Sequence, residues 1–285
     1  MGLDLVCVGE AFEDLIFHDL SEWPRLGEEF RTHRLLRTWG GGALLTAVAA
    51  SRQGSRVGVV SGLASAAHCF LRREGIQVRN LRRSHEAHAV TVALSTREDR
   101  AFVTYPGVNE QLEERFLSSL SGVRARHVHL ALEPRDCLAW VEALQRLSAR
   151  GITTSWDFGW HAELVHRPGF RQLTSSLDTL FLNEAEALLY AGSAPWEPWW
   201  QKQAGCTIVK LGKHGCLALT GSDRHAVAGL AVAAVDSTGA GDAFNGGFLA
   251  AILEGRDLHG ALELGNQVGA ASTLCAGGLE GLPRR

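Results

Sequence analysis

The sequence predicts an α/β fold: a doubly wound, mainly parallel sheet with helices on both faces and a small β-sheet lid. Short apolar runs alternate with segments of helical composition over most of the chain, and several of these segments stop at a glycine. Ala87–Ser95 and Ala101–Tyr105 instead alternate in polarity around the charged turn REDR, which indicates a hairpin with one polar face. Because a parallel sheet is covered on both faces, we assign this hairpin to a separate β-element.

The elements of the main sheet follow one another along the chain. Predicted strands are Leu5–Val8, Val57–Val60, Val128–Leu132, Thr153–Trp156, Thr179–Leu182, Thr207–Leu211, Cys216–Thr220 and Ala231–Val235. Predicted helices are Ala43–Gln53, Ala66–Glu74, Arg135–Ala149, Glu184–Tyr190, Ala240–Glu254 and Leu258–Leu274. We expect residues 1–285 to form one domain, with a lid from about 11–38 and 86–107.

Composition narrows the class of protein. Hydrophobic residues make up 46% and charged residues 21%, with a net charge of −3, so there is no electrostatic case for a nucleic-acid or membrane partner. No apolar run approaches the ~20 residues that span a bilayer, and the N-terminus does not resemble a signal peptide. The six cysteines are scattered, which predicts buried free thiols and a cytoplasmic location.

The stretch DSTGAGDAFNGG, beginning at Asp236, concentrates the chemistry. Gly239, Ala240 and Gly241 have almost no side chains and open a helix, whose first amides attract anions. The spacing is not that of a Walker loop. Asp242 would repel a phosphate unless it has another task, either capping the helix or accepting a proton from a hydroxyl that attacks phosphorus.

This stretch resembles the C-terminal signature of the ribokinase (PfkB) family of carbohydrate kinases. Five further segments resemble family motifs in family order: VGEAFEDL, GGGALLTAVAASRQG, EDRAFVTYPGVNEQL, LFLNEAEALLYAG and IVKLGKHG. The resemblance covers nearly the whole chain. It implies a ribokinase-like fold and transfer of the ATP γ-phosphoryl group to a hydroxyl of a sugar or sugar-like molecule.

The resemblance also implies roles for individual residues. Asp242 would be the general base, in an anion hole made by the amides of Gly239, Ala240, Gly241 and Asp242. Asn183 and Glu186 would organise Mg²⁺ through water. Asp236 and Thr238 match positions that hold a monovalent cation in several relatives, which makes K⁺ a candidate. The acceptor would meet Asp14, Gly41, Gly42 and Asn109. The ATP site would include Lys210, Gly212, Gly215 and Asn266.

Simpler interpretations of the same residues stay open. Asn183 and Glu186 are three apart at a helix start, which also describes a capping box. Asp14 fits a surface turn. Lys210 and Lys213 fit solvated charges at a strand end. The segment WEPWW, Trp196–Trp200, fits a helix that packs on the core.

Three departures from the family lie on the acceptor side. Leu45 stands where the family usually has an asparagine that bonds sugar hydroxyls. ASAAHCFL replaces a longer G-D-D-x-x-G-like turn, and WDFGWHAEL lacks the usual D-x-N-x-R, so Asp157 keeps only part of its expected setting. A nucleoside kinase, or an idle sensor of sugar or nucleotide, therefore remains as an alternative. An exposed lid edge also makes a homodimer through the lid plausible.

Overall fold

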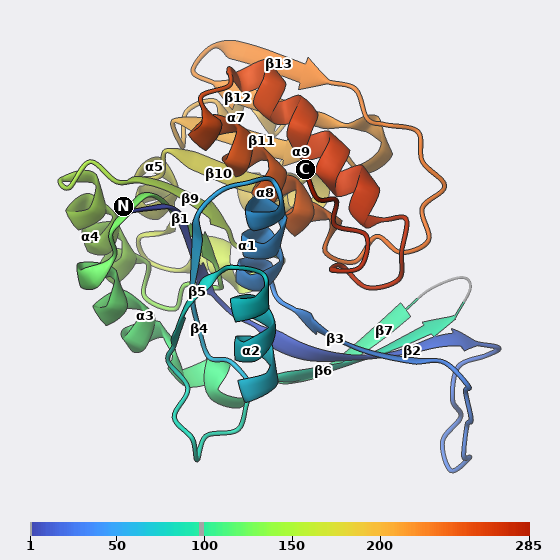
Figure 1. The fold of residues 1–285 in the computed structure, drawn as a ribbon. Coiled ribbons are helices and arrows are strands. Elements are labelled where there is room, and N and C mark those ends of the chain that lie inside the picture. The colour runs from blue at the N-terminus through green and yellow to red at the C-terminus, as the bar shows by residue number, and fades with distance from the viewer. Residues whose placement is uncertain (1, 97–99) are drawn as a thin grey trace.

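The computed structural model describes residues 2–96 and 100–285, and over these the main sheet has nine strands in the order β13-β12-β11-β10-β9-β8-β1-β4-β5 (Figure 1). From β5 to β11 all neighbouring strands are parallel, whereas β12 and β13 continue the sheet antiparallel. The strands are β1 Leu3–Gly9, β4 Val57–Ser61, β5 Gln77–Asn80, β8 Ala125–Ala131, β9 Thr153–Asp157, β10 Thr179–Asn183, β11 Cys206–Lys210, β12 Cys216–Thr220 and β13 Asp223–Val227.

Helices cover both faces of this sheet, as predicted. Successive residues of β1 point to opposite faces, so that Val6 and Val8 join one buried cluster while Leu5 and Cys7 join the other. The first cluster is covered by α3 Glu113–Ser119, α4 Cys137–Ser148, α5 Phe170–Ser175, α6 Glu184–Ala191 and α7 Glu197–Trp200. The second is covered by α1 Gly42–Arg52, α2 Ser65–Arg73, α8 Ala240–Glu254 and α9 Leu258–Ser272. The helix expected around Trp196–Trp200 is therefore real, and Trp200 is fully buried.

The hairpin belongs to a second sheet, as expected. Its strands are β2 Phe12–Leu20, β3 Leu35–Gly40, β6 Val90–Thr96 and β7 Arg100–Tyr105, in the order β3-β2-β6-β7. The sheet extends away from the body of the molecule (Figure 1). Residues 97–99 of the predicted charged turn lie outside the described residues. Directly paired residues share a face, so Asp14 lies on the same face as Thr38 and Thr91.

The structure differs from the predicted elements in several places. The short helices α3 and α5 were not predicted, nor were β2 and β3 as separate strands within the expected lid. Ala231–Val235 forms no strand, because its last amide, that of Val235, donates to Thr273 O in the C-terminal loop at 2.7 Å. The edge strands β5 and β13 were missed because they are short and largely polar. The last helix ends at Ser272 and not at Leu274.

The cysteines also differ in part from expectation. Cys7, Cys137 and Cys216 are buried thiols, but Cys69 and Cys275 are exposed. Cys69 is exposed because α2 is amphipathic and buries only Ala67 and Leu71.

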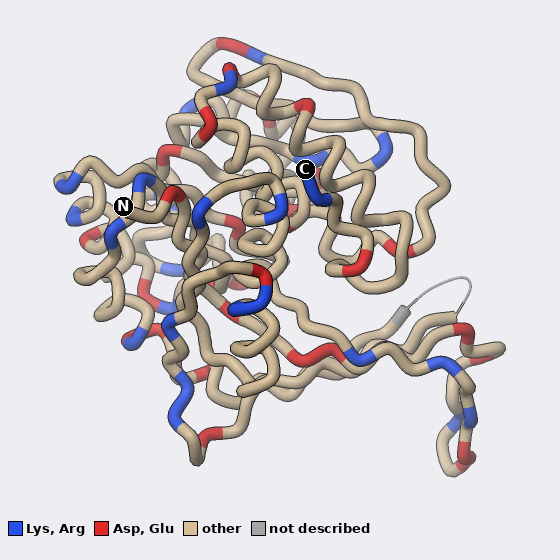
Figure 2. Tube along the Cα trace, in the orientation of Figure 1, with Lys and Arg blue, Asp and Glu red and all other residues tan. Residues whose placement is uncertain are grey.

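Charges of both signs are spread over the described residues (Figure 2). Figure 2 shows acidic and basic residues interspersed over both the body and the small sheet. Within the described residues, no helix combines the length and the apolar character needed to cross a bilayer.

Candidate active site

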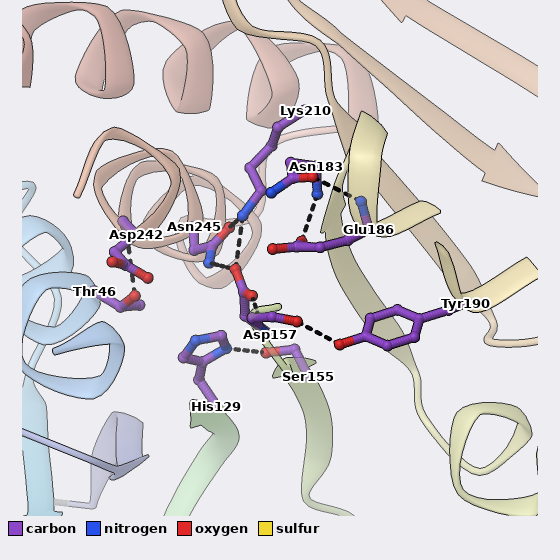
Figure 3. A network of polar contacts seen from close by, with 11 residues as sticks. Thr46, His129, Ser155, Asp157, Asn183, Glu186, Tyr190, Lys210, Asp242 and Asn245 are labelled. Carbon is purple, nitrogen blue, oxygen red and sulfur yellow. Dashed lines mark hydrogen bonds and ion pairs between the residues drawn. The ribbon is translucent and has the colours of Figure 1, made fainter. Parts of the chain in front are cut away.

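The candidate site lies where the carboxyl ends of three neighbouring strands face the start of α8. Asp157 ends β9, Asn183 ends β10 and Lys210 ends β11. These strands are parallel, so their last residues meet at one edge of the sheet. Figure 3 shows the side chains converging there, together with Asp242 and Asn245 from α8.

The turn before α8 fits an anion-binding site. Gly239 precedes the helix in the left-handed conformation, with φ 72°. The amide of Ala240 donates to Ser237 O at 3.2 Å. The amides of Gly241 and Asp242 have no acceptor in the described parts of the chain. Of the four amides predicted for the anion hole, those of Gly239, Gly241 and Asp242 thus donate no hydrogen bond to the described residues, whereas that of Ala240 stabilises the turn itself.

Asp242 is partly buried and lies against the start of α1. A Cβ atom placed on Gly42 would lie 3.0 Å from Asp242 Oδ1, so glycine leaves room for the carboxylate. Burial raises the pKa of Asp242 to about 7, with Asp157 and Glu186 adding negative charge and Lys210 opposing them. A carboxyl group with this pKa can take up and release a proton near neutral pH.

Lys210 is not a solvated charge, which corrects the simpler interpretation above. Only 14% of its side chain is exposed, and Nζ lies 2.7 Å from Asp157 Oδ2. Asn245 Nδ2 donates to the same Asp157 oxygen at 2.8 Å. Burial would raise the pKa of Asp157, but the Lys210 ammonium and these hydrogen bonds hold it below its usual value. Lys213, by contrast, is exposed as expected.

Sequence reasoning missed Asn245 and gave Asp157 only a partial role. Asn245 was within the recognised signature, three residues after Asp242, a spacing that places both on one helix face. A second polar group, His129 on β8, was not detectable because nothing in the sequence marks it. Its Nδ1 lies 2.9 Å from Ser155 Oγ, and burial lowers its pKa to about 4.

Asn183 and Glu186 do form a capping box. Asn183 Oδ1 accepts from Glu186 N at 2.8 Å, and Glu186 Oε2 accepts from Asn183 N at 2.8 Å. Glu186 Oε1 has no hydrogen-bond partner among the residues described. Burial, then the charge of Asp157, raises the pKa of Glu186. One remaining carboxylate oxygen fits contact with Mg²⁺ through water, because that ion keeps several of its waters.

The predicted nucleotide residues fall into two groups. Gly212, with φ 57°, faces open space, whereas a Cβ atom on Gly215 would lie 2.0 Å from Val227 O. Asn266 Nδ2 donates to Ala228 O at 3.1 Å. Gly215 and Asn266 therefore hold the loop after β13 in place, and Gly212 is the accessible member of this set.

The predicted acceptor residues lie at the base of the second sheet. Asp14 is in the middle of a strand and not in a surface turn: a Cβ atom on Gly40 would lie 2.0 Å from its Oδ2. Burial raises the pKa of Asp14 to about 7. Asn109 Nδ2 donates to Ala11 O at 3.3 Å, while its buried Oδ1 has no partner within the described structure. Gly41, with φ 97°, allows the chain to pass close to Glu10 O.

Two loops meet at Asp236. Its Oδ1 accepts from Thr238 N at 2.9 Å and from Thr238 Oγ1 at 2.7 Å, and its Oδ2 accepts from Gly277 N at 3.0 Å. The carboxylate thus joins the turn before α8 to the C-terminal loop.

Leu45 is buried between these loops. A Cβ atom on Gly239 would lie 2.6 Å from Leu45 Cδ1, and one on Gly278 would lie 3.2 Å from it. The side chain that replaces the family's asparagine thus packs against the anion-binding turn and the C-terminal loop.

Both the sequence and the fold have relatives among known proteins. The model of the pfkB family of carbohydrate kinases matches residues 3–285. The chain is 28% identical over 219 residues to an uncharacterised sugar kinase of Archaeoglobus fulgidus, covering 74% of this chain and 87% of the relative. It is 27% identical to a cytidine kinase of Thermococcus kodakarensis, covering 92% and 93%. The fold matches a ribokinase structure from Giardia lamblia with a TM-score of 0.84, 19% identity and coverage of 99% and 98%. The chain therefore belongs to the pfkB family of carbohydrate kinases and is an ATP-dependent kinase.

Proposed function

We propose that this kinase transfers the γ-phosphoryl group of ATP to a hydroxyl of a sugar or sugar-like acceptor, with Asp242 as general base. The observation that carries the proposal is the position of the Asp242 carboxyl group, whose pKa is about 7, beside two amides without acceptors at the start of α8. Such amides stabilise negative charge on a transferring phosphoryl group. The same carboxylate argues against an idle sensor.

Each step of the proposed reaction has a group at the site. The acceptor oxygen attacks the γ-phosphorus, its proton passes to a carboxylate oxygen of Asp242, and the bond from the γ-phosphorus to the bridging oxygen breaks to release ADP. The Gly241 and Asp242 amides would hold the transferred group. Asn183 and Glu186 would bind, through water, the Mg²⁺ ion whose charge offsets that of the phosphate oxygens.

A nucleoside acceptor is the second candidate, and Leu45 is the observation that favours it. A buried leucine cannot bond sugar hydroxyls as the family's asparagine does, and it packs against the anion-binding turn. Related proteins include a 2-dehydro-3-deoxygluconokinase of Bacillus subtilis as well as the cytidine kinase. Both acceptor classes therefore belong in the first experiment.

That experiment measures ADP release from ATP and Mg²⁺ against a panel of sugars, sugar acids and nucleosides. Stimulation by one acceptor, lost in Asp242→Asn, supports the proposal and identifies the acceptor class. If no acceptor of the panel stimulates ADP release, although the protein is folded and still binds ATP in calorimetry, the result would favour the sensor instead.

Asp14→Asn should weaken acceptor binding and leave the nucleotide site intact. The Asp14 carboxylate has no partner among the described residues, so an acceptor hydroxyl is free to bond it. Loss of a charged hydrogen bond costs about 1.5–3 kcal/mol, which predicts a rise in acceptor KM of about 10–100-fold. Steady-state kinetics, with the KM for ATP as internal control, would test this; an unchanged acceptor KM would contradict the role of Asp14.

Three further properties are part of the proposal. We place a monovalent cation such as K⁺ near Asp236 and Thr238, whose oxygens lie in the turn that leads to Gly239. A comparison of activity in KCl and in choline chloride tests this site.

We place a dimer contact on the second sheet, where the edge strand β7 exposes Phe102, Val103 and Tyr105. The molar mass from light scattering tests this contact. Cysteines without disulfides support a cytoplasmic location.

A further inference from the structure

We infer that Lys210 binds the γ-phosphate of the nucleotide, and that Asp157 and Asn245 are positioning residues that hold its ammonium beside the anion-binding turn. The inference rests on the proposed function and adds to it two residues and a means of distinguishing ATP from ADP. It depends on the position of one nitrogen atom, Lys210 Nζ.

Lys210 Nζ lies against the turn where the transferred group is expected. A Cβ atom placed on Gly241 would be 3.1 Å from Nζ. Gly241 immediately precedes Asp242, and its amide has no acceptor among the described residues. The ammonium is therefore close to the phosphoryl group that is proposed to be transferred beside Asp242.

The ammonium is fixed by contacts from two other elements. Nζ donates to Asp157 Oδ2 at 2.7 Å and faces Asn245 Oδ1 at 3.4 Å. Asn245 also donates to Asp157 Oδ2, so that the three side chains form a closed set (Figure 3). Asp157 is itself held, since its Oδ1 accepts from Gly159 N at 3.1 Å. A lysine side chain that loses its freedom before the ligand arrives loses less on binding.

One donor of the ammonium remains available. An ammonium group has three N–H donors, and Asp157 and Asn245 take two of them. The third has no protein acceptor in the described structure. Asn245 follows Asp242 by three residues on α8, so the helix that carries the base also carries a support of the cation.

The carboxyl groups around Lys210 explain why a cation is needed at this place to bind a phosphate. Asp157, Glu186 and Asp242 all bring carboxyl groups to the site, and an added phosphate would be repelled by them. Lys210 is the cation that these carboxylates share. Burial lowers the pKa of Lys210, but the negative charges of Asp157, Glu186 and Asp242 raise it above its usual value. A buried cation at this place attracts the most negative part of ATP, which ADP lacks.

Calorimetric titration of ATP and of ADP, each with Mg²⁺, tests the inference without an acceptor. Lys210→Met should weaken ATP binding about 10–100-fold and ADP binding less than about threefold, because a charge-assisted contact to the γ-phosphate is lost. Lys213→Met, in the adjacent exposed lysine, is the matched control and should change neither affinity. Asp157→Asn and Asn245→Ala should each lower the ratio of ATP to ADP affinity, by less than Lys210→Met does.

Lys210→Met leaves a buried carboxylate unpaired and could unfold the protein. The double variant Lys210→Met/Asp157→Asn removes both charges, and circular dichroism shows whether it folds. A folded double variant that has lost the preference for ATP supports the inference. An ATP-to-ADP ratio unchanged from wild type overturns it, while turnover sensitive to Asp242→Asn would leave the proposed function standing. A wild-type protein that binds neither nucleotide would overturn both.

Discussion

Asp242→Asn is expected to lower kcat about 10²–10⁴-fold, the usual range for a positioned general base. An amide has nearly the shape of the carboxylate but cannot accept the proton of the acceptor hydroxyl. The affinity for ATP should not fall, because the Gly241 and Asp242 amides belong to the backbone and loss of the Asp242 charge removes a repulsion of the phosphate. Initial rates of ADP release, with the acceptor identified by the panel, measure the effect.

The pH profile of the wild-type enzyme provides an independent check. The proposed base works deprotonated and its pKa is about 7, so kcat at saturating acceptor should fall about tenfold for each pH unit below about 7 and level off above it. Asp223→Asn, which changes an exposed carboxylate of β13, is the control and should have the kcat and the pH profile of the wild type. A folded Asp242→Asn enzyme with less than a tenfold loss of kcat would contradict the assignment.

The same variant should be more stable than wild type at pH 8. The pKa of Asp242 rises from its ordinary 3.8 to about 7 in the folded protein, so between these values the folded state holds a proton that the unfolded state has released. This contribution to the free energy of unfolding is complete below pH 3.8 and is lost as pH rises through 7. Each pH unit corresponds to about 1.4 kcal/mol, so Asp242→Asn should gain on the order of 2–4 kcal/mol at pH 8.

The measurement is urea unfolding of both proteins at pH 5 and pH 8. The wild-type curve alone is not enough, because other groups titrate in the same range. Asp14 acts in the same direction as Asp242, whereas burial lowers the pKa of His127 to about 3 and that of His129 to about 4, which removes stability as pH falls below 6.5. The difference between variant and wild type isolates Asp242. An equal difference at both pH values would contradict the prediction.

Much of the fold could be predicted from the sequence because the relevant signals are local. Apolar runs and glycine stops located most of the parallel strands and their helices, and alternation located the hairpin of the second sheet. The exceptions have more than one physical cause. The edge strands β5 and β13 bury little, so they carry no apolar pattern, and Ala231–Val235 has a strand's composition but gives its last amide to the C-terminal loop.

The candidate site divides in the same way. By itself the sequence determined the glycine turn, the carboxylate after it and the pair Asn183 and Glu186, since each lies within a few residues of the chain. Only the tertiary structure decided that Lys210 is buried on Asp157 and Asn245, because these three come from β11, β9 and α8. The same holds for Leu45, whose role depends on contacts with Gly239 and Gly278. Contacts between segments that are distant in the sequence determine how deeply these side chains are buried and which charges surround them. The local sequence pattern does not contain that information.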